Sequence, residues 1–563
     1  MKRSGAEIIV TLIERQGVKT VTGIPGGANL PIYDALGKGG LRHVLARHEQ
    51  GAGFIAQGMA RVSGRAEVCM GTSGPGTTNL LTAIADARLD SIPLVAITGQ
   101  VPGSFIGTDA FQEVDTCGIT LPITKQNFLA RSPEELLEIV PLAFRIAESG
   151  RPGPVLIDVP KDVQKQTARF DRWPDPKTRQ TPAPPNDREI HRLADMIEAA
   201  RRPILYIGGG IIASGASEEI RRLARKNGLP VTSTLMGLGA FPTDDPLYLG
   251  MLGMHGARYT NYALEEADLL IAVGVRFDDR ATGKADEFCP TAAIAHIDID
   301  RAQIGKIKHA NLSIASDAGE AIRRLIPLVK ENPRSEWNDR IARLKEEFPL
   351  ETPEESDPLH PINLVKIIGR ILEPSDIIST DVGQHQMWAA QVYPFKRPRT
   401  WLTSGGLGTM GFGVPAAIGA ALAVEESGNP GSRRSVCISG DGSFLMNMQE
   451  LATMADLGLP VKIIIFNNGH LGLVRQQQEL FYGERYLATR FETVPDFTAL
   501  ARAFGIPSCN LGDSSDPVDM LKEALEAPGS FVVDAPIHFE ENVFPMVAPG
   551  GANREMIGGL IHA

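Results

Sequence analysis

The side chains best suited to chemistry are a carboxylate and an amide that each follow an apolar run. Asp441, inside a Gly-Asp-Gly triplet, comes after the run 436–438, and Asn468 follows the run 461–466. The two residues are 468 − 441 = 27 positions apart, a spacing that suits one strand–helix–strand crossover. Both side chains are therefore expected at the same edge of a parallel sheet, where ligands of such folds bind.

The chemistry that this pair suits is the binding of Mg²⁺ and phosphate. Carboxylate and amide oxygens are hard ligands that Mg²⁺ prefers, and the ion usually completes its shell with phosphate oxygens and water. The glycines on either side of Asp441 allow the main chain to approach a phosphate. A Gly-Asp-Gly triplet alone is better explained by an ordinary strand–turn–helix unit with a capping aspartate. Asn468, at this spacing, is what favours the metal site.

This pattern resembles the signature of enzymes that use thiamine diphosphate, in which a Gly-Asp-Gly triplet precedes an Asn-Asn pair. The resemblance implies that Asp441, Asn468 and the main-chain carbonyl of His470 bind Mg²⁺. It also implies that the metal fixes the cofactor diphosphate beside Gly442 and Ser443.

Length, charge and cysteine usage limit the class of protein. A chain of 563 residues is too long for one hydrophobic core and predicts about three domains. The net charge of −11 argues against nucleic acid or an anionic membrane as the main partner, and no apolar run approaches membrane-spanning length. The five cysteines are scattered without CxxC spacing. Neither a zinc site nor a disulfide framework is expected, and a reducing compartment, the cytoplasm, is predicted.

The first domain is predicted over residues 1–165 as an α/β unit with a parallel sheet. Ser4 and Glu7 have the types and spacing of a capping box, so a helix is expected to start there. A second helix, rich in small residues, is predicted over 51–61. Short apolar runs alternate with the helical segments and predict strands at 18–24, 68–71, 94–98 and 155–159.

Glu49, just before the second of these helices, has two interpretations. As a charge at a helix N-terminus it needs no further role. Beside a thiamine diphosphate site it has one, because a buried carboxylate on the pyrimidine ring nitrogen favours the imino tautomer that deprotonates the thiazolium C2. The context Arg-His-Glu-Gln-Gly-Ala matches that of the family's activating glutamate.

Longer stretches narrow the resemblance to the catalytic large subunit of acetohydroxyacid (acetolactate) synthases, along essentially the whole chain. They are VTGIPGGANLPIYDAL, LARHEQGAGFIAQGMAR, SGPGTTNLLTAIADARLDSIPLVAITGQV, TDAFQEVD and SGRPGPVLIDVPKDV. The resemblance implies that Gly27 lies against the reaction centre and that Phe111, Gln112 and Lys161 line the active site from the neighbouring subunit of a homodimer or larger assembly. Considered alone, these last three are better explained as a core aromatic, a turn amide and a surface cation.

A proline-rich linker is predicted over 166–190, and a central domain over 191–330. Apolar runs at 204–207, 231–234, 269–275 and 294–297 predict a further α/β unit. Gly208, Gly210 and Ala213 fit a GxGxxA fingerprint. The acidic residue that a nicotinamide site needs about 20 residues further on is missing, so we reject a nicotinamide site.

The family resemblance implies instead that the central domain binds FAD, although the net reaction is not a redox one. A guanidinium such as that of Arg151 suits a pyrophosphate, and Asp298 at a strand end suits a ribose or adenine donor. The alternative is a domain that binds no flavin. The residues that match FAD-binding segments of the family are Arg151, Gly253, Met254, His255, Gly256, Arg276, Asp278 and Asp298.

A second, charged linker is predicted over 331–360, and a third domain over 361–540 with a strand at 377–380. Domains one and three are expected to be two copies of one α/β fold. The expected architecture is thus α/β, with three doubly wound parallel-sheet domains: a pyrimidine-binding, a central FAD-binding and a diphosphate-binding domain.

The resemblance assigns further cofactor contacts to the third domain. Gly383, Gln384 and His385 would help to hold the diphosphate. The main chain of Gly408 and Met410 would bond the aminopyrimidine, and the Met410 side chain would wedge the cofactor into its bent shape.

Residues 471–478 are predicted to enter a helix over the site. Most family members have Trp where this chain has Gln477, and the resemblance implies that this position, with Leu473 and Val474, sets the acceptor preference. An indole offers apolar contact to the extra methylene of 2-oxobutyrate, so we expect Gln477 to discriminate weakly between 2-oxo acids. The glycine-rich tail 541–563 resembles a mobile lid that excludes water.

The activity implied is that of an acetolactate synthase, the first common step of valine, leucine and isoleucine biosynthesis. Pyruvate is decarboxylated on thiamine diphosphate, and the hydroxyethyl unit condenses with a second pyruvate or with 2-oxobutyrate. The family usually pairs this subunit with a small regulatory one. A pyruvate oxidase or a glyoxylate carboligase is the alternative with similar cofactors, but the second lacks the activating glutamate. A non-catalytic binding protein would have no use for Glu49.

Overall fold

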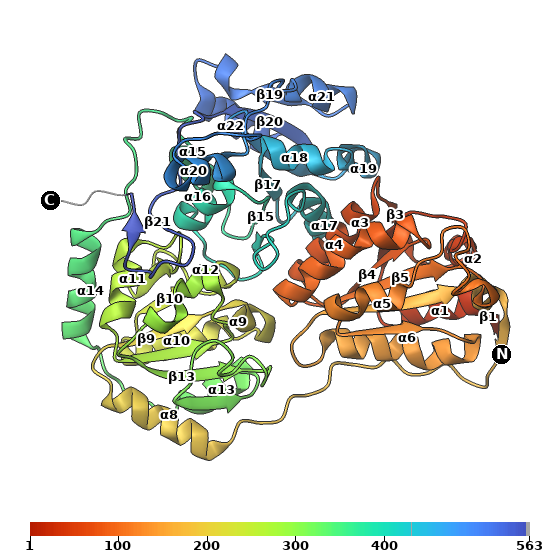
Figure 1. Ribbon diagram of the computed structural model, residues 1–563, viewed down its shortest axis with the longest axis horizontal. Coiled ribbons are helices and arrows are strands. Elements are labelled where there is room, and N and C mark those ends of the chain that lie inside the picture. The colour runs from red at the N-terminus through yellow and green to blue at the C-terminus, as the bar shows by residue number, and fades with distance from the viewer. Residues whose placement is uncertain (430, 559–563) are drawn as a thin grey trace.

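Three six-stranded sheets dominate the computed structural model, which describes residues 1–429 and 431–558 (Figure 1). All strand pairs within these three sheets are parallel. This confirms the predicted α/β class with three parallel-sheet domains. The central strands are continuous apolar runs because helices cover both faces of each sheet. Among the residues described, no helix is both long and apolar enough to cross a membrane.

The first sheet has the strand order β3-β2-β4-β5-β7-β6. Its strands are β2 (Thr20–Gly23), β3 (Arg42–Leu45), β4 (Glu67–Gly71), β5 (Leu94–Gln100), β6 (Gln126–Leu129) and β7 (Pro154–Pro160). The surrounding helices are α1 (Gly5–Arg15), α2 (Leu30–Leu36), α3 (Glu49–Ser63), α4 (Pro75–Asp90), α5 (Thr116–Thr120), α6 (Pro133–Glu148) and α7 (Lys161–Lys165). The capping box of Ser4 and Glu7 is present. In this first sheet, the two strands that sequence analysis missed are the edge strands β3 and β6, whose partly exposed residues do not form an apolar run.

The third domain repeats the topology of the first. Its sheet order is β16-β15-β17-β18-β20-β19, and counting each sheet's strands along the chain gives 2-1-3-4-6-5 in both. The strands are β15 (Ile377–Thr380), β16 (Trp401–Leu402), β17 (Ser435–Gly440), β18 (Val461–Asn467), β19 (Ser508–Asn510) and β20 (Phe531–Pro536). The helices are α15 (Pro361–Ile371), α16 (Gln384–Val392), α17 (Gly413–Glu426), α18 (Asp441–Asn447), α19 (Glu450–Leu457), α20 (Gly472–Phe481), α21 (Phe497–Ala503) and α22 (Pro517–Glu526). The shared order confirms that the two domains have one fold.

The central sheet has a different order, β11-β10-β9-β12-β13-β14, or 3-2-1-4-5-6 along the chain. This order places a switch point between β9 and β12, where dinucleotides bind in such sheets. The strands are β9 (Pro203–Ile207), β10 (Val231–Ser233), β11 (Tyr248–Met251), β12 (Leu269–Val273), β13 (Ala293–Asp298) and β14 (Leu312–Ala315). The helices are α8 (Asp187–Ala199), α9 (Gly209–Ser214), α10 (Ser217–Asn227), α11 (Arg258–Glu266), α12 (Asp279–Thr282), α13 (Ala318–Leu325) and α14 (Ser335–Glu347).

Both segments predicted as linkers contain regular structure, and the linker bounds themselves stay a prediction. Within 166–190, β8 (Thr167–Arg169) pairs with β1 (Lys2–Ser4) and α8 has already begun. Within 331–360, α14 packs on the central domain, where the indole N–H of Trp337 donates to the Pro203 carbonyl at 3.1 Å. The charged residues of this segment occupy the exposed face of a helix, and composition alone did not separate that case from a linker.

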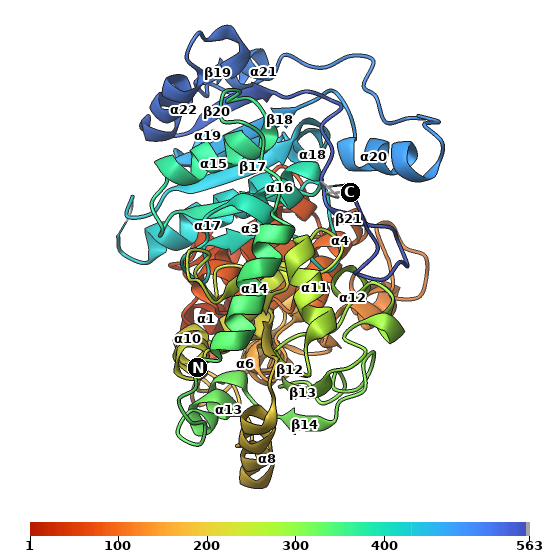
Figure 2. The ribbon, with the colours of Figure 1, turned by 90° about the vertical axis from the view of Figure 1, so that its left-hand side faces the viewer.

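Helices α3 and α17 pack against each other and join domain one to domain three (Figure 2). Each contributes a glycine to the crossing: a Cβ at Gly58 would lie 2.9 Å from the Cα of Ala416, and one at Gly419 would lie 2.9 Å from the main-chain nitrogen of Met59. Both distances are below the 3.0 Å that real Cβ atoms require. The glycines therefore let the two helices approach closely, and this crossing fixes Glu49, the first residue of α3, relative to the third domain.

The C-terminal tail lies against the central domain. Its strands β21 (Met546–Val547) and β22 (Met556–Ile557) pair with each other. Main-chain hydrogen bonds link it to the domain, from Val547 to Met254 and from Lys284 to Gly551, each at 2.9 Å. The predicted lid role of this tail stays a prediction, and residues 559–563 of it lie outside the described residues.

Candidate cofactor sites

Asp441 and Asn468 lie at the carboxyl ends of the neighbouring parallel strands β17 and β18, as predicted. Asp441 is buried, and its carboxylate accepts hydrogen bonds from the main-chain N–H groups of Gly442 at 2.7 Å and Gly469 at 2.6 Å. The amide oxygen of Asn468 accepts from the N–H of His470 at 3.0 Å. The structure therefore brings the three predicted metal-binding residues together around one turn.

The electrostatics of this turn suit a cation. Burial raises the pKa of Asp441 to about 6, although the surrounding main-chain N–H groups act in the opposite direction. A nearby Mg²⁺ would favour the ionised carboxylate. In the described part of the chain no three His, Cys, Asp or Glu side chains cluster in a way that holds a metal. An ion at Asp441 would thus complete its shell with amide, main-chain, phosphate and water oxygens, as Mg²⁺ commonly does.

A small pocket surrounds Asp441, and one of its walls carries an unsatisfied polar atom. The ring of His385, at the start of α16, is buried, and its Nε2 has no hydrogen-bond partner among the described residues. Burial lowers the pKa of His385 to about 3, so the ring is neutral. A buried ring nitrogen of this kind is free to bond a ligand or an ordered water. The lining includes Gly383, Gln384, Met410, Gly442, Ser443, Asn468, His470, Leu473 and Val474.

The predicted activating and substrate-side residues gather elsewhere, at the carboxyl edge of the first sheet. Glu49 is 9% exposed and its carboxylate accepts from the side-chain amide of Asn79 at 2.9 Å. Gln112 has a left-handed backbone with φ of 59° and packs against Gly74. Phe111 is 88% exposed. Glu49, Gln112 and Phe111 are not among the described residues that line the small pocket around Asp441.

Gly27 and Lys161 belong to the same edge of the first sheet. Gly27 follows β2, and a Cβ there would meet no atom within 4 Å. Lys161 begins α7 directly after β7. A single chain therefore carries the predicted site residues in two separate groups, one around Glu49 and one around Asp441.

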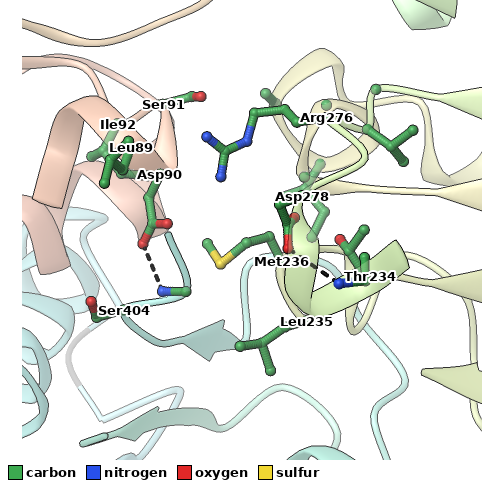
Figure 3. Close-up of a pocket in the computed structure, with 18 of the residues that line it drawn as sticks. Leu89, Asp90, Ser91, Ile92, Thr234, Leu235, Met236, Arg276, Asp278 and Ser404 are labelled. Carbon is green, nitrogen blue, oxygen red and sulfur yellow. Dashed lines mark hydrogen bonds between the residues drawn. The ribbon is translucent and has the colours of Figure 1, made fainter. Parts of the chain in front are cut away.

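A larger cavity of about 470 Å³ lies between the three domains (Figure 3). In Figure 3 the segment Leu89–Ile92 of the first domain, the segment Thr234–Met236 of the central domain and Ser404 of the third surround it. The loops after β9 and β12 also line it, at the topological switch point of the central sheet. This is the position at which a dinucleotide is expected.

Two guanidinium groups give this cavity a positive wall. Arg151 is held by a hydrogen bond from its Nε to the Ser91 hydroxyl at 2.8 Å, and the Arg276 guanidinium points into the cavity (Figure 3). Burial, and then the neighbouring charge of Arg276, lowers the pKa of Arg151 to about 10, so it remains a cation. Arg151 already has one carboxylate nearby, that of Asp300 at 3.8 Å, and the planar guanidinium groups of the two arginines also have the geometry that binds a pyrophosphate.

The other residues predicted for FAD differ in how they reach the cavity. Met254, His255, Asp278 and Asp298 line it. Burial raises the pKa of Asp298 to about 6, and its carboxylate accepts from the main chain two residues further on at 2.8 Å. Nδ1 of His255 is buried without a hydrogen-bond partner in the described structure. Gly253 and Gly256, by contrast, shape the turn beside the cavity: a Cβ at Gly253 would lie 2.8 Å from the Cα of Ala281 and one at Gly256 2.8 Å from the Cα of Leu252.

Known proteins match the chain along its whole length. Models of the thiamine pyrophosphate enzyme domains match at 3–119 (N-terminal TPP binding domain), 190–325 (central domain) and 381–535 (C-terminal TPP binding domain). The acetolactate synthase isozyme 1 large subunit of Escherichia coli (strain K12) is 56% identical, over 99% of this chain and 98% of its own. The chain belongs to the acetolactate synthase family of thiamine pyrophosphate enzymes. Further relatives are the acetolactate synthase large subunit of Parasynechococcus marenigrum (strain WH8102), 48% identical over 99% and 91%, and the acetolactate synthase of Mycobacterium bovis (strain ATCC BAA-935 / AF2122/97), 47% identical over 98% and 91%.

Helix α20 connects the two pockets of this family member. Leu473 lines both of them, Gln477 lines the large cavity and Val474 the small pocket. Val474 is also 47% exposed. The three residues predicted to set specificity thus lie on one helix, between the small pocket around Asp441 and the large cavity.

Sequence reasoning missed a buried carboxylate that shapes the small pocket around Asp441. Asp381 follows β15, and its carboxylate accepts from the main-chain N–H groups of Gly411 at 2.7 Å and Gly413 at 3.1 Å, so it holds the turn after Met410. Burial raises the pKa of Asp381 to about 6. Its position at a strand end is the signal that identified Asp441, and the same rule would have found it.

Proposed function

We propose that this enzyme condenses two 2-oxo acids with loss of CO₂, giving 2-acetolactate from two pyruvates or 2-aceto-2-hydroxybutyrate from pyruvate and 2-oxobutyrate. Family membership gives the acetolactate synthase reaction, the first common step of branched-chain amino acid biosynthesis. The structural observation that carries the proposal is the shared turn of Asp441, Asn468 and His470 beside the unsatisfied His385. Bound thiamine diphosphate supplies the electron sink for decarboxylation.

The third domain would hold the diphosphate half of the cofactor. Asp441, Asn468 and the His470 carbonyl would bind Mg²⁺, and the neutral His385 ring would meet a phosphate oxygen through Nε2. The remaining contacts would come from the main chain and side chains of Gly383, Gln384, Gly442 and Ser443, which line the same pocket. Gly408 and Met410 would face the pyrimidine half.

A homodimer would complete the site, because Glu49 and Asp441 belong to separate half-sites of one chain. Three exposed apolar side chains of one segment, Phe105, Ile106 and Phe111, support this assembly, since a group of exposed apolar residues is typical of a contact with a partner. We propose that Glu49 holds or moves the proton at the pyrimidine ring nitrogen. Gln112 and the main chain of Gly27 would orient the acceptor. Lys161 would attract the acceptor carboxylate.

The large cavity would hold FAD. Arg151 and Arg276 provide two cations for its pyrophosphate, and Asp298 provides an acceptor for a ribose hydroxyl or the adenine amine. The position at the switch point of a 3-2-1-4-5-6 sheet supports a dinucleotide. Since the condensation is redox-neutral, the flavin would serve as a structural component and stay oxidised through turnover.

Partners and location follow from the relatives and from composition. Several relatives are designated large subunits, so a small regulatory subunit is the expected partner, beside the 2-oxo acid substrates. All five cysteines are free in the described structure, which supports a reducing compartment, and we propose the cytoplasm.

One assay tests the reaction. The protein is incubated with pyruvate, thiamine diphosphate, Mg²⁺ and FAD, and acetolactate, acetaldehyde and flavin absorbance are followed together. Acetolactate with the flavin still oxidised is expected. Bleached flavin would instead indicate an oxidase, acetaldehyde a decarboxylase, and no consumption of pyruvate would refute the substrate. Chelation of Mg²⁺ with EDTA is expected to stop turnover and to leave the flavin bound, because the two pockets are separate.

Glu49→Gln tests the assigned proton role. After the substitution, the Asn79 side-chain amide can still donate a hydrogen bond to a side-chain oxygen at this position. The cofactor should therefore still bind. The rate is expected to fall about 100-fold or more, the usual contribution of a positioned acid or base. A variant that binds thiamine diphosphate normally and turns over at the wild-type rate would show that Glu49 has no such role.

A further inference from the structure

Three charged side chains form a buried cluster between domains one and three, and two of them, Arg61 and Asp90, also line the large cavity. Arg61 lies on α3, and Asp86 and Asp90 lie on α4. Nη2 of Arg61 is 2.8 Å from the Asp90 carboxylate and 3.3 Å from that of Asp86. Both carboxylate side chains are 0% exposed. One guanidinium therefore faces two carboxylates, and the cluster needs further donors if burial of these charges is not to destabilise the fold.

The further donors come from one loop of the third domain, residues 403–410. The Asp90 carboxylate accepts from the main-chain N–H groups of Gly405 at 3.1 Å and Gly406 at 2.7 Å. Figure 3 shows this contact beside Ser404. The hydroxyl of Thr409 donates to Asp86 at 3.1 Å.

Two more bonds complete the attachment of this loop. The Ser404 hydroxyl donates to the Asp86 carboxylate, and Nη1 of Arg61 donates to the Thr403 carbonyl at 3.0 Å. The cluster of the first domain thus fixes both the beginning and the end of the 403–410 loop.

The other side of the 403–410 loop faces both cofactor pockets. Gly408, whose φ of 72° requires a glycine-like conformation, lines the large cavity, and Met410 lines the pocket of the metal ligands. Both residues lie within four positions of a group that the cluster binds. A shift of the loop would therefore move the two residues that we assign to the aminopyrimidine.

We propose that Arg61, Asp86 and Asp90 are positioning residues that hold the 403–410 loop in the conformation that binds the aminopyrimidine half of thiamine diphosphate. The inference rests on the role proposed above for Gly408 and Met410. It assigns part of the cofactor affinity to side chains of the first domain that need not touch the cofactor. The two aspartates suit this role because carboxylates accept strong hydrogen bonds from main-chain N–H groups, and this loop has no neighbouring strand to bond them.

Thiamine diphosphate binding to Asp90→Asn tests the proposal. The enzyme is saturated with FAD and Mg²⁺ and titrated with thiamine diphosphate by calorimetry. Loss of one charge-assisted bond is expected to raise the Kd about tenfold or more. At saturating thiamine diphosphate the KM for pyruvate should stay within about twofold of the wild-type value, and Asp90→Glu should restore part of the affinity. The matched control is Glu425→Gln, which removes an exposed ion pair with Arg42 across the same two domains, 2.9 Å long, without touching the loop.

The outcomes separate positioning from simple domain attachment. A lower melting temperature for Asp90→Asn with a wild-type Kd, or an equal rise in Kd for Glu425→Gln, would overturn the proposal. Should Asp90→Asn fail to fold, Thr409→Val removes only one hydroxyl bond to Asp86, and an unchanged Kd in that variant would overturn it as well. The Kd values measure binding alone, so they decide this proposal even if the wild-type enzyme makes no acetolactate.

Discussion

Replacing Gly419 by alanine should destabilise the contact between domains one and three. Gly419 lies in the middle of α17, where α3 crosses it, and an added Cβ would lie 2.9 Å from the main-chain nitrogen of Met59 and closer still to the carbonyl of Ile55. Ordinary contact begins at 3.4 Å, so the overlap with the nitrogen alone is 3.4 − 2.9 = 0.5 Å. The atoms in the way belong to the main chain of α3 and cannot rotate aside.

Two opposing terms set the size of the effect. Alanine is favoured over glycine inside a helix by about 1 kcal/mol, which would stabilise the variant. Overpacking of a well-packed contact costs about 1–3 kcal/mol, and main-chain obstacles place this site at the upper end. The net loss is therefore about 2 kcal/mol, which lowers the melting temperature of a domain of 150–250 residues by about 4–8 °C.

Thermal unfolding of the cofactor-free protein at one scan rate measures this loss. Ala423→Gly, further along α17, reports the helix-propensity term in the same helix. Gly58→Ala, on the facing helix, should give a similar loss, and the double variant should lose less than the sum because the first methyl already separates the helices. A higher melting temperature for Gly419→Ala, as helix propensity alone predicts, would refute the reasoning. So would strict additivity of the two substitutions.

Two further predictions concern pH and acceptor choice. Burial, and then the charge of Glu426, raises the pKa of Glu67 from 4.5 to about 8. The folded state therefore binds this proton more tightly than the unfolded state does. The stability that this proton contributes is lost as the pH rises from 4.5 to about 8. Glu67→Gln should accordingly melt at a higher temperature than the wild type at pH 8 and at the same temperature near pH 4.5, and a gap that does not depend on pH would contradict this. Gln477→Trp should raise the preference for 2-oxobutyrate over pyruvate about fourfold in a two-substrate competition, since one buried methylene is worth about 0.8 kcal/mol. A wild-type enzyme that already prefers 2-oxobutyrate strongly would refute the expectation that Gln477 discriminates weakly.

The Asp441 turn could be predicted from the sequence because its determinants are local. A buried strand, a helix and a second buried strand follow one another, and parallel strands bring their carboxyl ends to one edge. The pair Asp441 and Asn468 thus needed no knowledge of distant segments. The same holds for the capping box at Ser4 and for the class of all three domains.

The regular structure inside the two predicted linkers, and the edge strands β3 and β6, could not be predicted for a related reason. The exposed face of α14 and the partly exposed residues of β3 and β6 carry polar side chains, so composition resembles that of a loop. Only packing decides these segments, as when the Trp337 indole bonds to Pro203 on the central sheet. Local sequence does not contain the surface against which such an element is buried.

The sequence by itself determined the three α/β units and the position of Asp441 and Asn468 at one sheet edge, because periodicity and strand-end residues act over a few tens of positions. The cofactor class was indicated by the family resemblance of its motifs. Only the tertiary structure decided how these units meet. It placed Glu49 and Asp441 at the edges of different sheets and crossed α3 and α17 on their glycines. It also brought Arg61, Asp86 and Asp90 to the 403–410 loop from more than 300 residues away. Contacts between such distant segments depend on how whole domains are placed relative to one another. The surfaces that the domains bury against each other determine this placement, and no local sequence pattern contains it.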